Sequence, residues 1–130
     1  MAHGLNKVMV IGQLTREPEM RFTPSGKSVS NFCVACDRSW HDTENNVHTK
    51  TDWFNVVAWG NLAEISKQTL HIGNLVYVEG RLQTRSWQDH EGQQQKSVEI
   101  IARDIIMLSE KQNENDNVDG DCENDKDNHL

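Results

Sequence analysis

The chain has 130 residues and a formal net charge of −7, and hydrophobic residues make up 35% of it. This is the length of one domain with room for a tail, and the low apolar share indicates that part of the chain is unfolded. No apolar run approaches the roughly 18–20 residues of a membrane span, and the start, MAHGLNKVMVIGQ, lacks the long apolar core of a secretory signal. We therefore expect a cytoplasmic protein, or an organellar one already processed.

The acidity is concentrated at the C-terminal end. Residues 1–110 hold 11 lysines and arginines against 13 acidic residues, whereas residues 111–130 hold 2 against 7. The last segment, KQNENDNVDGDCENDKDNHL, is poor in apolar residues, which favours disorder. We predict a folded domain over residues 1–110 and a disordered acidic tail over 111–130. The nearly neutral domain neither indicates nor excludes a nucleic-acid partner.

Cys33 and Cys36 form a C-x-x-C pattern, which occurs in redox and zinc sites. They lie in SVSNFCVACDR, a segment with the composition of a strand. Residues three apart on a strand point to opposite faces and lie about 10 Å apart along the strand. A disulfide needs Cα atoms about 5.5 Å apart. We expect one thiol to pack inward and the other to face out, and we predict no metal site and no cofactor.

The first part of the chain reads as strands. NKVMVIGQLT (6–15) is dense in β-branched residues and predicts a strand with a bulge or bend at Gly12. REPEMRFTPSGK (16–27) predicts a short edge strand and a turn, and SVSNFCVACDR (28–38) predicts a second long strand. SWHDTENNVHTKT (39–51) has no periodicity, and either a long exposed loop or an extended hairpin tip fits it.

DWFNVVAW (52–59) alternates as a third strand. Its predicted inward face consists of Phe54, Val56 and Ala58, and its other face consists of Trp53, Asn55, Val57 and Trp59.

A change of period follows the third strand. GNLAEISKQTLHIGN (60–74) has helical spacing, with Asn61 as the predicted N-cap and Gly73 as the predicted C′ residue. LVYVEGRLQTRSW (75–87) and KSVEIIARDIIML (96–108) return to strand patterns, joined by a loop. Five strands with one helix between the third and fourth is the order of an oligonucleotide-binding (OB) fold, an all-β Greek-key barrel. A different small α+β sheet would share this order.

The four tryptophans, with the basic residues near them, predict a binding surface. A barrel needs only one inward face, so Trp53 and Trp59 are expected to face out, toward a nucleic acid or another chain. Bases stack on aromatic rings whatever their identity. The predicted aromatic contacts to a nucleic acid are Trp40, which opens the segment 39–51, Trp53, Trp59 and Trp87. Asn55, between Trp53 and Trp59, is a predicted polar contact. The predicted cations are Lys7, Arg21, Arg38, Lys50 and Arg85, and Lys96 is a further candidate.

Three segments resemble the bacterial-type single-stranded DNA-binding protein family: LNKVMVIGQLTREPEMRFTPSGKSV, TDWFNVVAWGNLAE and VYVEGRLQTRSW. The resemblance covers residues 4–108 in order. It implies an OB-fold homotetramer that coats single-stranded DNA without sequence preference in replication, recombination and repair, associated with the nucleoid. By motif, the resemblance implies stacking roles for Trp40, Trp53, Trp59 and Trp87, and basic roles for Lys7, Arg21 and Arg85.

The chain departs from the family pattern in two ways. Neutral residues or histidines stand at several places where relatives carry Lys or Arg, so we expect a shallower salt dependence and a larger share for stacking. The family's acidic tail ends in an apolar tip with Pro and Phe that recruits replication and repair proteins, whereas this tail ends in NDKDNHL. Partner recruitment by the tail therefore does not carry over residue by residue.

Other classes of function fit less well. No G-x-S-x-G, H-E-x-x-H or P-loop motif is present, so we expect no enzyme and name no catalytic residue. A dimeric primosome-type OB protein that mainly contacts other proteins would share the barrel, and the four placed tryptophans favour DNA binding over it. RNA binding stays open, because aromatic platforms also accept RNA.

Overall fold

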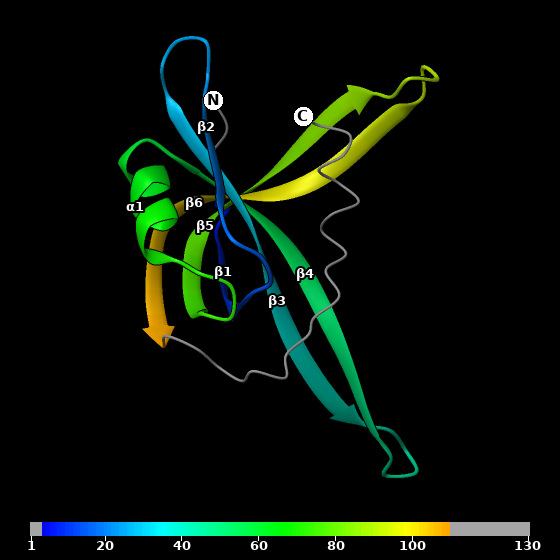
Figure 1. Cartoon of the computed structure of the whole chain (residues 1–130). Helices are drawn as coiled ribbons and strands as arrows, with labels where there is room; N and C mark the ends of the chain where they lie inside the picture. Colours follow the sequence, from blue (N-terminus) through cyan, green and yellow to red (C-terminus); the bar gives the residue numbers. More distant parts are fainter. Residues whose placement is uncertain (1–3, 110–130) are drawn as a thin grey trace.

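The computed structural model describes residues 4–109 and contains six strands and one helix in that range (Figure 1). Their type and order agree with the prediction, including the short second strand. In chain order they are β1 (Val8–Leu14), β2 (Glu19–Phe22), β3 (Ser28–His41), β4 (Val47–Trp59), α1 (Asn61–Thr69), β5 (Leu75–Gln88) and β6 (Gln94–Ser109).

The strands form one sheet that closes on itself. Its order is β1-β5-β6-β4-β3-β2, and an additional pairing of β1 with β3 closes the ring, leaving β2 as a short edge strand on β3. All pairs are antiparallel except β4 with β6, where Val56 lies opposite Ile100 in a parallel ladder. The predicted five-stranded OB barrel, with its helix between the third and fourth barrel strands, is confirmed.

One side-chain row from each barrel strand fills the interior. On β3, Phe32 and Val34 are at most 1% exposed, and on β4, Val56 is fully buried beside them. The helix α1 packs against β3 and β4 and buries Ala63 and Ser66. The remaining members of the core are Leu14, Leu70, Val76, Val78 and Ile100. Cys36 packs against this core, whereas Cys33 is buried on the other face of β3, so the two cysteines lie on opposite faces as predicted.

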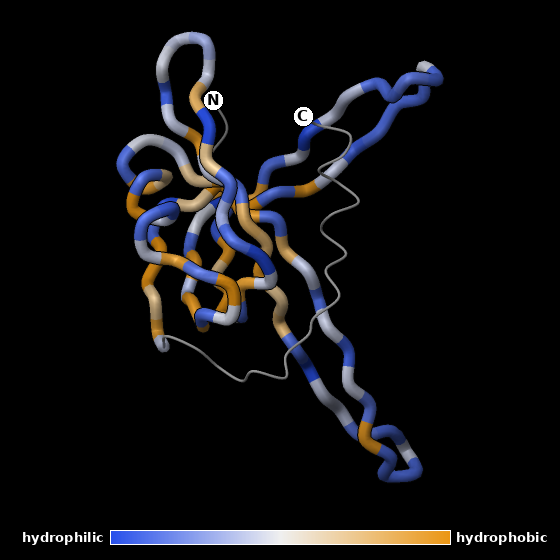
Figure 2. The backbone as a smooth tube through the Cα atoms, viewed as in Figure 1, coloured by the Kyte–Doolittle hydropathy of each residue, from blue (hydrophilic) through white to orange (hydrophobic). Residues whose placement is uncertain are grey.

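Two strand pairs continue beyond the barrel as projecting ribbons (Figure 1). The β3–β4 arm runs from the pair Asp37–Thr51 to the pair His41–Val47, and the β5–β6 arm runs from Arg85–Ser97 to Gln88–Gln94. Of the two interpretations of residues 39–51, the extended hairpin is therefore correct. Both arms are mostly hydrophilic, and the apolar residues gather in the barrel and α1 (Figure 2). The β3–β4 arm has no buried face and shows no apolar alternation, which is why its strands were not evident in the sequence.

Both predicted ends of the helix are wrong. The N-cap is Gly60, at a φ of 65°, and Asn61 is the first helical residue. The position needs glycine because a side chain rarely adopts positive φ. The helix ends at Thr69, and Gly73, at a φ of 93°, lies in the following turn, where its N–H donates to the Leu14 carbonyl at 2.9 Å. The positive φ of this turn, rather than a helix cap, accounts for the glycine, and the hydrogen bond ties the turn to β1.

Close backbone approach accounts for the glycines inside the strands. Of the bulge or bend predicted at Gly12, the bulge is wrong, because β1 keeps one register with β5 from Val8 to Gln13. β1 changes partner just after Gly12, since Gln13 and Leu14 pair with β3. A Cβ on Gly12 would instead meet the backbone carbonyl oxygen of Ala35. The β5–β6 ladder has two register shifts, and at the one between Glu79 and Gly80 a Cβ on Gly80 would meet the carbonyl oxygen of Ile101 on β6.

We expect Gly80→Ala to destabilise the fold by about 1–3 kcal/mol, because a main-chain carbonyl within a sheet cannot rotate away from the added methyl group. The measurement is the free energy of unfolding from urea titration. Gly4→Ala is the matched control, since nothing lies within 4 Å of a Cβ there. Equal stability of the two variants would contradict the assigned packing of β5 on β6.

A carboxylate ties the loop after β1 to the turn after α1. One Glu17 oxygen lies 3.1 Å from Nδ1 of His71, and the other accepts the N–H of Ile72 at 3.0 Å. The Ile72 N–H is the main cause that lowers the pKa of Glu17 below its ordinary 4.5, with a smaller contribution from His71. Because the folded pKa is depressed, this contact stabilises the fold above about pH 4.5 and is lost as the pH falls through the folded pKa.

We expect Glu17→Gln to lower the free energy of unfolding at pH 6–7 by at most about 1 kcal/mol, because the Glu17 side chain is 53% exposed. The difference from the unmodified chain should shrink as the pH falls from 5.5 toward 3. Urea titrations across this range measure it, with Glu91→Gln on the distant β5–β6 turn as control. A stability difference that stays constant with pH would argue against a stabilising contact that depends on the charge of Glu17.

Candidate functional site

The outer face of β4 carries the predicted polar and aromatic row. Val56 and Ala58 are fully buried, so the alternating positions Trp53, Asn55 and Trp59 point away from the core. Trp59 is 43% exposed. This arrangement agrees with the predicted division of the strand into an inner and an outer face.

The sheet pairing adds neighbours to this row from three strands. Trp59 lies opposite Val29 on β3, which lies opposite Arg21 on β2. Asn55 lies opposite Cys33 on one side and Glu99 of β6 on the other. Directly opposed residues share a face of a sheet, so the outer faces of β2, β3, β4 and β6 form one surface.

A groove of about 440 Å³ crosses this surface. It brings together three of the predicted residues, Arg21, Trp59 and Arg85. Phe22, Val57 and Glu99 line it as well, so its walls offer both apolar surface and charge. A groove of this kind suits a ligand with flat apolar rings and anionic groups, which describes a single nucleic-acid strand.

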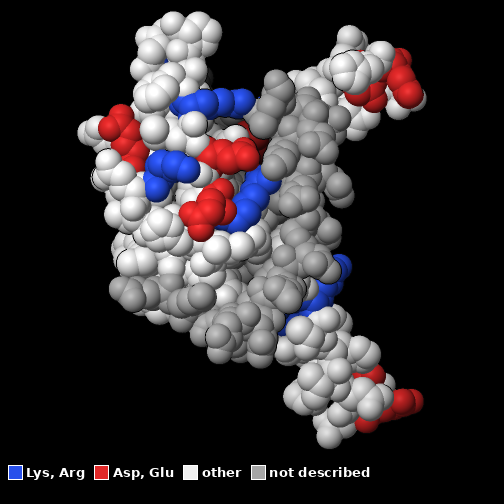
Figure 3. Space-filling view, in the orientation of Figure 1, with Lys and Arg blue, Asp and Glu red and all other residues white. Residues whose placement is uncertain are grey.

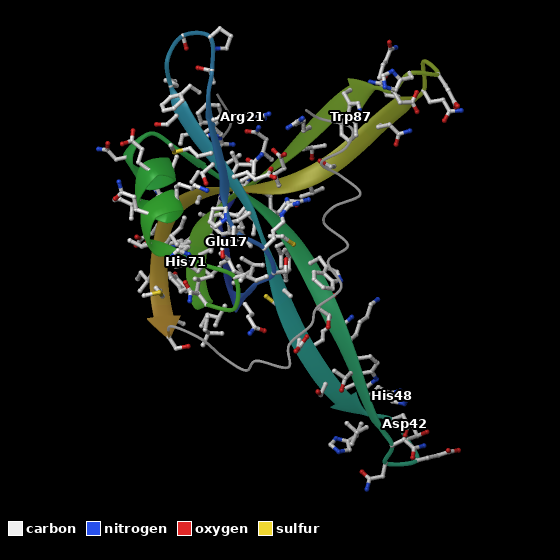
Figure 4. The ribbon with its side chains drawn as sticks, viewed as in Figure 1. Glu17, Arg21, Asp42, His48, His71 and Trp87 are labelled. Carbon is white, nitrogen blue, oxygen red and sulfur yellow. The ribbon has the colours of Figure 1, made fainter. Side chains whose placement is uncertain are left out.

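Trp87 and Arg85 lie two residues apart on the β5–β6 arm and share one of its faces. The Arg85 guanidinium carbon lies 5.9 Å from the centroid of the Trp87 ring. Nη1 of Arg85 also lies 3.3 Å from an oxygen of Glu99, which is buried. Arg85 thus connects the groove to the ring of Trp87, which Figure 4 shows on the β5–β6 arm.

Trp40 lies on a different face from Trp53. It belongs to β3 itself rather than to a loop, and it is directly opposite His48. By alternation, Trp40 and Arg38 continue the row of Val34, on the side of the strand that faces the core within the barrel. On the arm this row is free of the barrel, and Trp40 is 42% exposed. The structure therefore does not bring Trp40 into the groove.

Two of the predicted cations, Arg38 and Lys50, are exposed on the same face of the arm as Trp40. Arg38 lies opposite Lys50 in the β3–β4 register. Its Nε donates to Asp52 at 3.0 Å, and its guanidinium carbon lies 5.2 Å from the centroid of the Trp40 ring. Arg38 is thus positioned by a carboxylate and an aromatic ring of the same arm.

Lys7 lies outside the groove. Its Nζ is 3.4 Å from an oxygen of Glu79 on β5, and Glu79 also accepts the Tyr77 hydroxyl at 2.8 Å. The Tyr77 hydrogen bond is the main cause that lowers the pKa of Glu79, with a smaller contribution from Lys7. This cluster lies on the outer face of β1 and β5, so the structure separates Lys7 from the other predicted cations.

Glu99 is a charged residue of the groove that was not predicted from the sequence. It reaches the site through the parallel pairing of β6 with β4, which joins segments far apart in the chain and has no local sequence signature. Figure 3 shows lysines, arginines and carboxylates next to one another over the barrel, and carboxylates at the tips of both arms. The site is therefore a mixed surface rather than a basic patch.

Two further properties concern residues 4–109 alone. No helix in this range is long and apolar enough to cross a membrane. Within the same residues, no group of three His, Cys, Asp or Glu side chains is placed to hold a metal ion.

Comparison with known proteins gives one consistent result. Residues 5–108 match the model of the Single-strand binding protein family. The chain is 49% identical over 112 residues to single-stranded DNA-binding protein 1 of Chlorobaculum tepidum, covering 85% of this chain and 69% of that protein. It is 42% identical over 111 residues to a single-stranded DNA-binding protein of Neisseria meningitidis, covering 85% of this chain and 63% of the relative.

Solved structures agree with the sequence matches. A Plasmodium falciparum SSB in complex with ssDNA superimposes with a TM-score of 0.79 at 33% identity, covering 84% of this chain and 99% of that one. A deletion mutant of the single-stranded DNA-binding protein from Thermus aquaticus superimposes with a TM-score of 0.74 at 33% identity, covering 84% of this chain and 53% of the other.

Proposed function

The chain belongs to the Single-strand binding protein family, and we propose that it is a non-catalytic protein that binds single-stranded DNA without sequence preference. The observation that carries the proposal is the outer face of β4, where Trp53 and Trp59 point away from the core beside a groove flanked by Arg21 and Arg85. The named relatives and the DNA complex of a structural neighbour support it.

Stacking supplies most of the binding free energy in this proposal. An exposed indole such as Trp59 gives a base a flat apolar partner, worth about 1–3 kcal/mol per base, and accepts any of the four bases. Asn55, between the tryptophans, offers an amide for a sugar, phosphate or base edge. Trp87 and Trp40 extend the contacts along the two arms.

Phosphate contacts contribute less, because intramolecular carboxylates compete for the cations. Lys7, Arg38 and Arg85 each lie within 3.4 Å of a carboxylate oxygen. A phosphate must replace that carboxylate or share the cation with it, so fewer counterions are released than the number of basic residues suggests. Arg21 and Lys50 complete the proposed set of phosphate contacts.

A second exposed surface is apolar, and self-association of the chain would cover it. Ile11 of β1, Tyr77 of β5 and Ile106 of β6 lie opposite one another, and Ile11 and Ile106 are 56% and 47% exposed. Met9, next along β1, is 60% exposed. A monomer rarely leaves such a continuous apolar row in water. We propose that copies of the chain pair through this outer face of β1 and that the assembly is a homotetramer.

The biological setting completes the proposal. We infer a cytoplasmic protein, associated with the nucleoid, that protects single-stranded DNA during replication, recombination and repair. The predicted acidic tail, residues 111–130, lies outside the described residues, as does the boundary with the domain at residue 110. A role of the tail in recruiting replication or repair proteins stays a prediction.

Oligo-dT should strongly quench the intrinsic tryptophan fluorescence of the chain, and an equal-length duplex should not. Part of the quenching should survive 1 M salt, because stacking does not depend on counterion release. Trp53→Ala and Trp59→Ala should each weaken oligo-dT binding by about 1–3 kcal/mol. Ile72→Ala, an exposed apolar residue outside the groove, is the control.

Two results of this titration would redirect the assignment. No quenching by either DNA would indicate that the aromatic face contacts another protein, as in a primosome-type module. Tighter binding of oligo-rU than of oligo-dT would indicate an RNA-binding protein.

Ile11→Lys should lower the oligomeric mass of the full chain, because a charge in the paired apolar row would lose its hydration on assembly. Sedimentation velocity at micromolar concentration measures the mass, and circular dichroism checks the fold. Ile72→Lys, at an exposed isoleucine away from β1, should leave the mass unchanged. An unaltered mass for Ile11→Lys would refute pairing through this face.

A further inference from the structure

We propose that His48 is a positioning residue for Trp40, and that Asp42 holds His48 in place for this task. The inference rests on the proposed function, because it assigns Trp40 a base as its partner. It concerns the free protein, in which the β3–β4 arm would hold its indole ready for stacking. No prediction from the sequence included His48 or Asp42.

The geometry of the two rings is the first observation. Trp40 and His48 are directly opposite in the β3–β4 register, where cross-strand side chains come close together. Their ring centroids lie 5.5 Å apart with an interplanar angle of 21°, which is a stacked arrangement. Each ring therefore limits the rotation of the other.

Asp42 fixes the imidazole at its other end. Its Oδ2 lies 2.9 Å from Nε2 of His48, and Figure 4 shows both side chains at the tip of the arm. The second oxygen, Oδ1, accepts the backbone N–H groups of Glu44 and Asn46, each at 2.9 Å. These hydrogen bonds tie the carboxylate to the turn backbone. A continuous chain of contacts thus runs from the turn through Asp42 and His48 to Trp40.

His48 has charged groups of both signs on its face of the arm. Asp42 is the nearest charged group, and Arg38 and Lys50 lie on the same face of the arm. The hydrogen bond from His48 is the main cause that lowers the pKa of Asp42, so Asp42 is a carboxylate at neutral pH. The Asp42 carboxylate accepts a hydrogen bond from His48 whenever Nε2 carries a proton, which is so in one neutral tautomer and in the charged imidazole.

Holding the indole in advance strengthens binding. Immobilising a mobile side chain on association costs conformational entropy, and this cost is avoided when the side chain is already ordered. Trp40 still has 42% of its surface exposed, which leaves area for a base. Arg38, over the ring at 5.2 Å and tied to Asp52, restrains the indole further.

A double-mutant cycle on the full chain tests the proposal. We expect His48→Ala to weaken oligo-dT binding about two- to ten-fold, measured by fluorescence anisotropy, and to have no effect in a Trp40→Ala background. His48→Phe, which keeps a flat ring against Trp40, should restore most of the affinity. Val47→Ala is the matched control, because Val47 is exposed next to His48 on the other face of the arm.

A second readout needs no DNA. The ring protons of His48 should resonate upfield in the NMR spectrum because of the Trp40 ring current, and Trp40→Ala should abolish this shift. Absence of the shift overturns the proposed stack.

Three affinity results would also overturn the proposal. The first is unchanged oligo-dT affinity of His48→Ala. The second is a higher affinity of His48→Ala, which would mean that His48 competes with the base. The third is an equal loss of affinity on His48→Ala with and without Trp40. Failure of the unmodified chain to bind oligo-dT would instead overturn the proposed function itself, and the positioning role with it.

Discussion

The alternation of side chains along β4 is the constraint on which the functional surface depends. Once Val56 and Ala58 fill the barrel, the residues between them have no place in the core and must point outward. Trp53 and Trp59 are therefore surface residues as a direct result of barrel closure. The same pairing aligns them with residues of β2, β3 and β6, so the stability of the barrel and the order of the site have one cause.

The cations described above lie in close pairs with carboxylates and do not form a region of one sign of charge. Arg85 with Glu99, and Arg38 with Asp52, are cations whose long side chains are already ordered by carboxylates and aromatic rings. Such pairs give little long-range attraction for a polyanion, and they keep each guanidinium at a defined place on the surface. Contact shape, more than net charge, then governs which ligands fit.

Local patterns in the sequence predicted the strands, the helix and the row on β4, and the resemblance to a known family favoured the barrel over another small α+β sheet. Phe54, Val56 and Ala58 predict the inner face, and the change of period after residue 60 predicts the helix. The helix ends were wrong because Gly60 and Gly73 are set by backbone conformation and by contacts with distant strands. Glu99 and the separate location of Lys7 depend on sheet pairings between distant segments. The sequence thus predicted candidate site residues, but it did not show which of them lie together.

The two arms also have a consequence for the order in which the chain folds. Within each arm the pairs are local: His41 pairs with Val47, and Gln88 with Gln94, across one short turn. Barrel closure instead requires Val8 to meet Gly80, and it closes a loop of most of the domain. Because loop-closure entropy slows distant pairings, we expect the hairpins to form early and the β1–β5 ladder to form late. Until β1 docks, β5 has an unpaired edge, and a nascent or stressed chain is most prone to pair with the wrong neighbour at that edge.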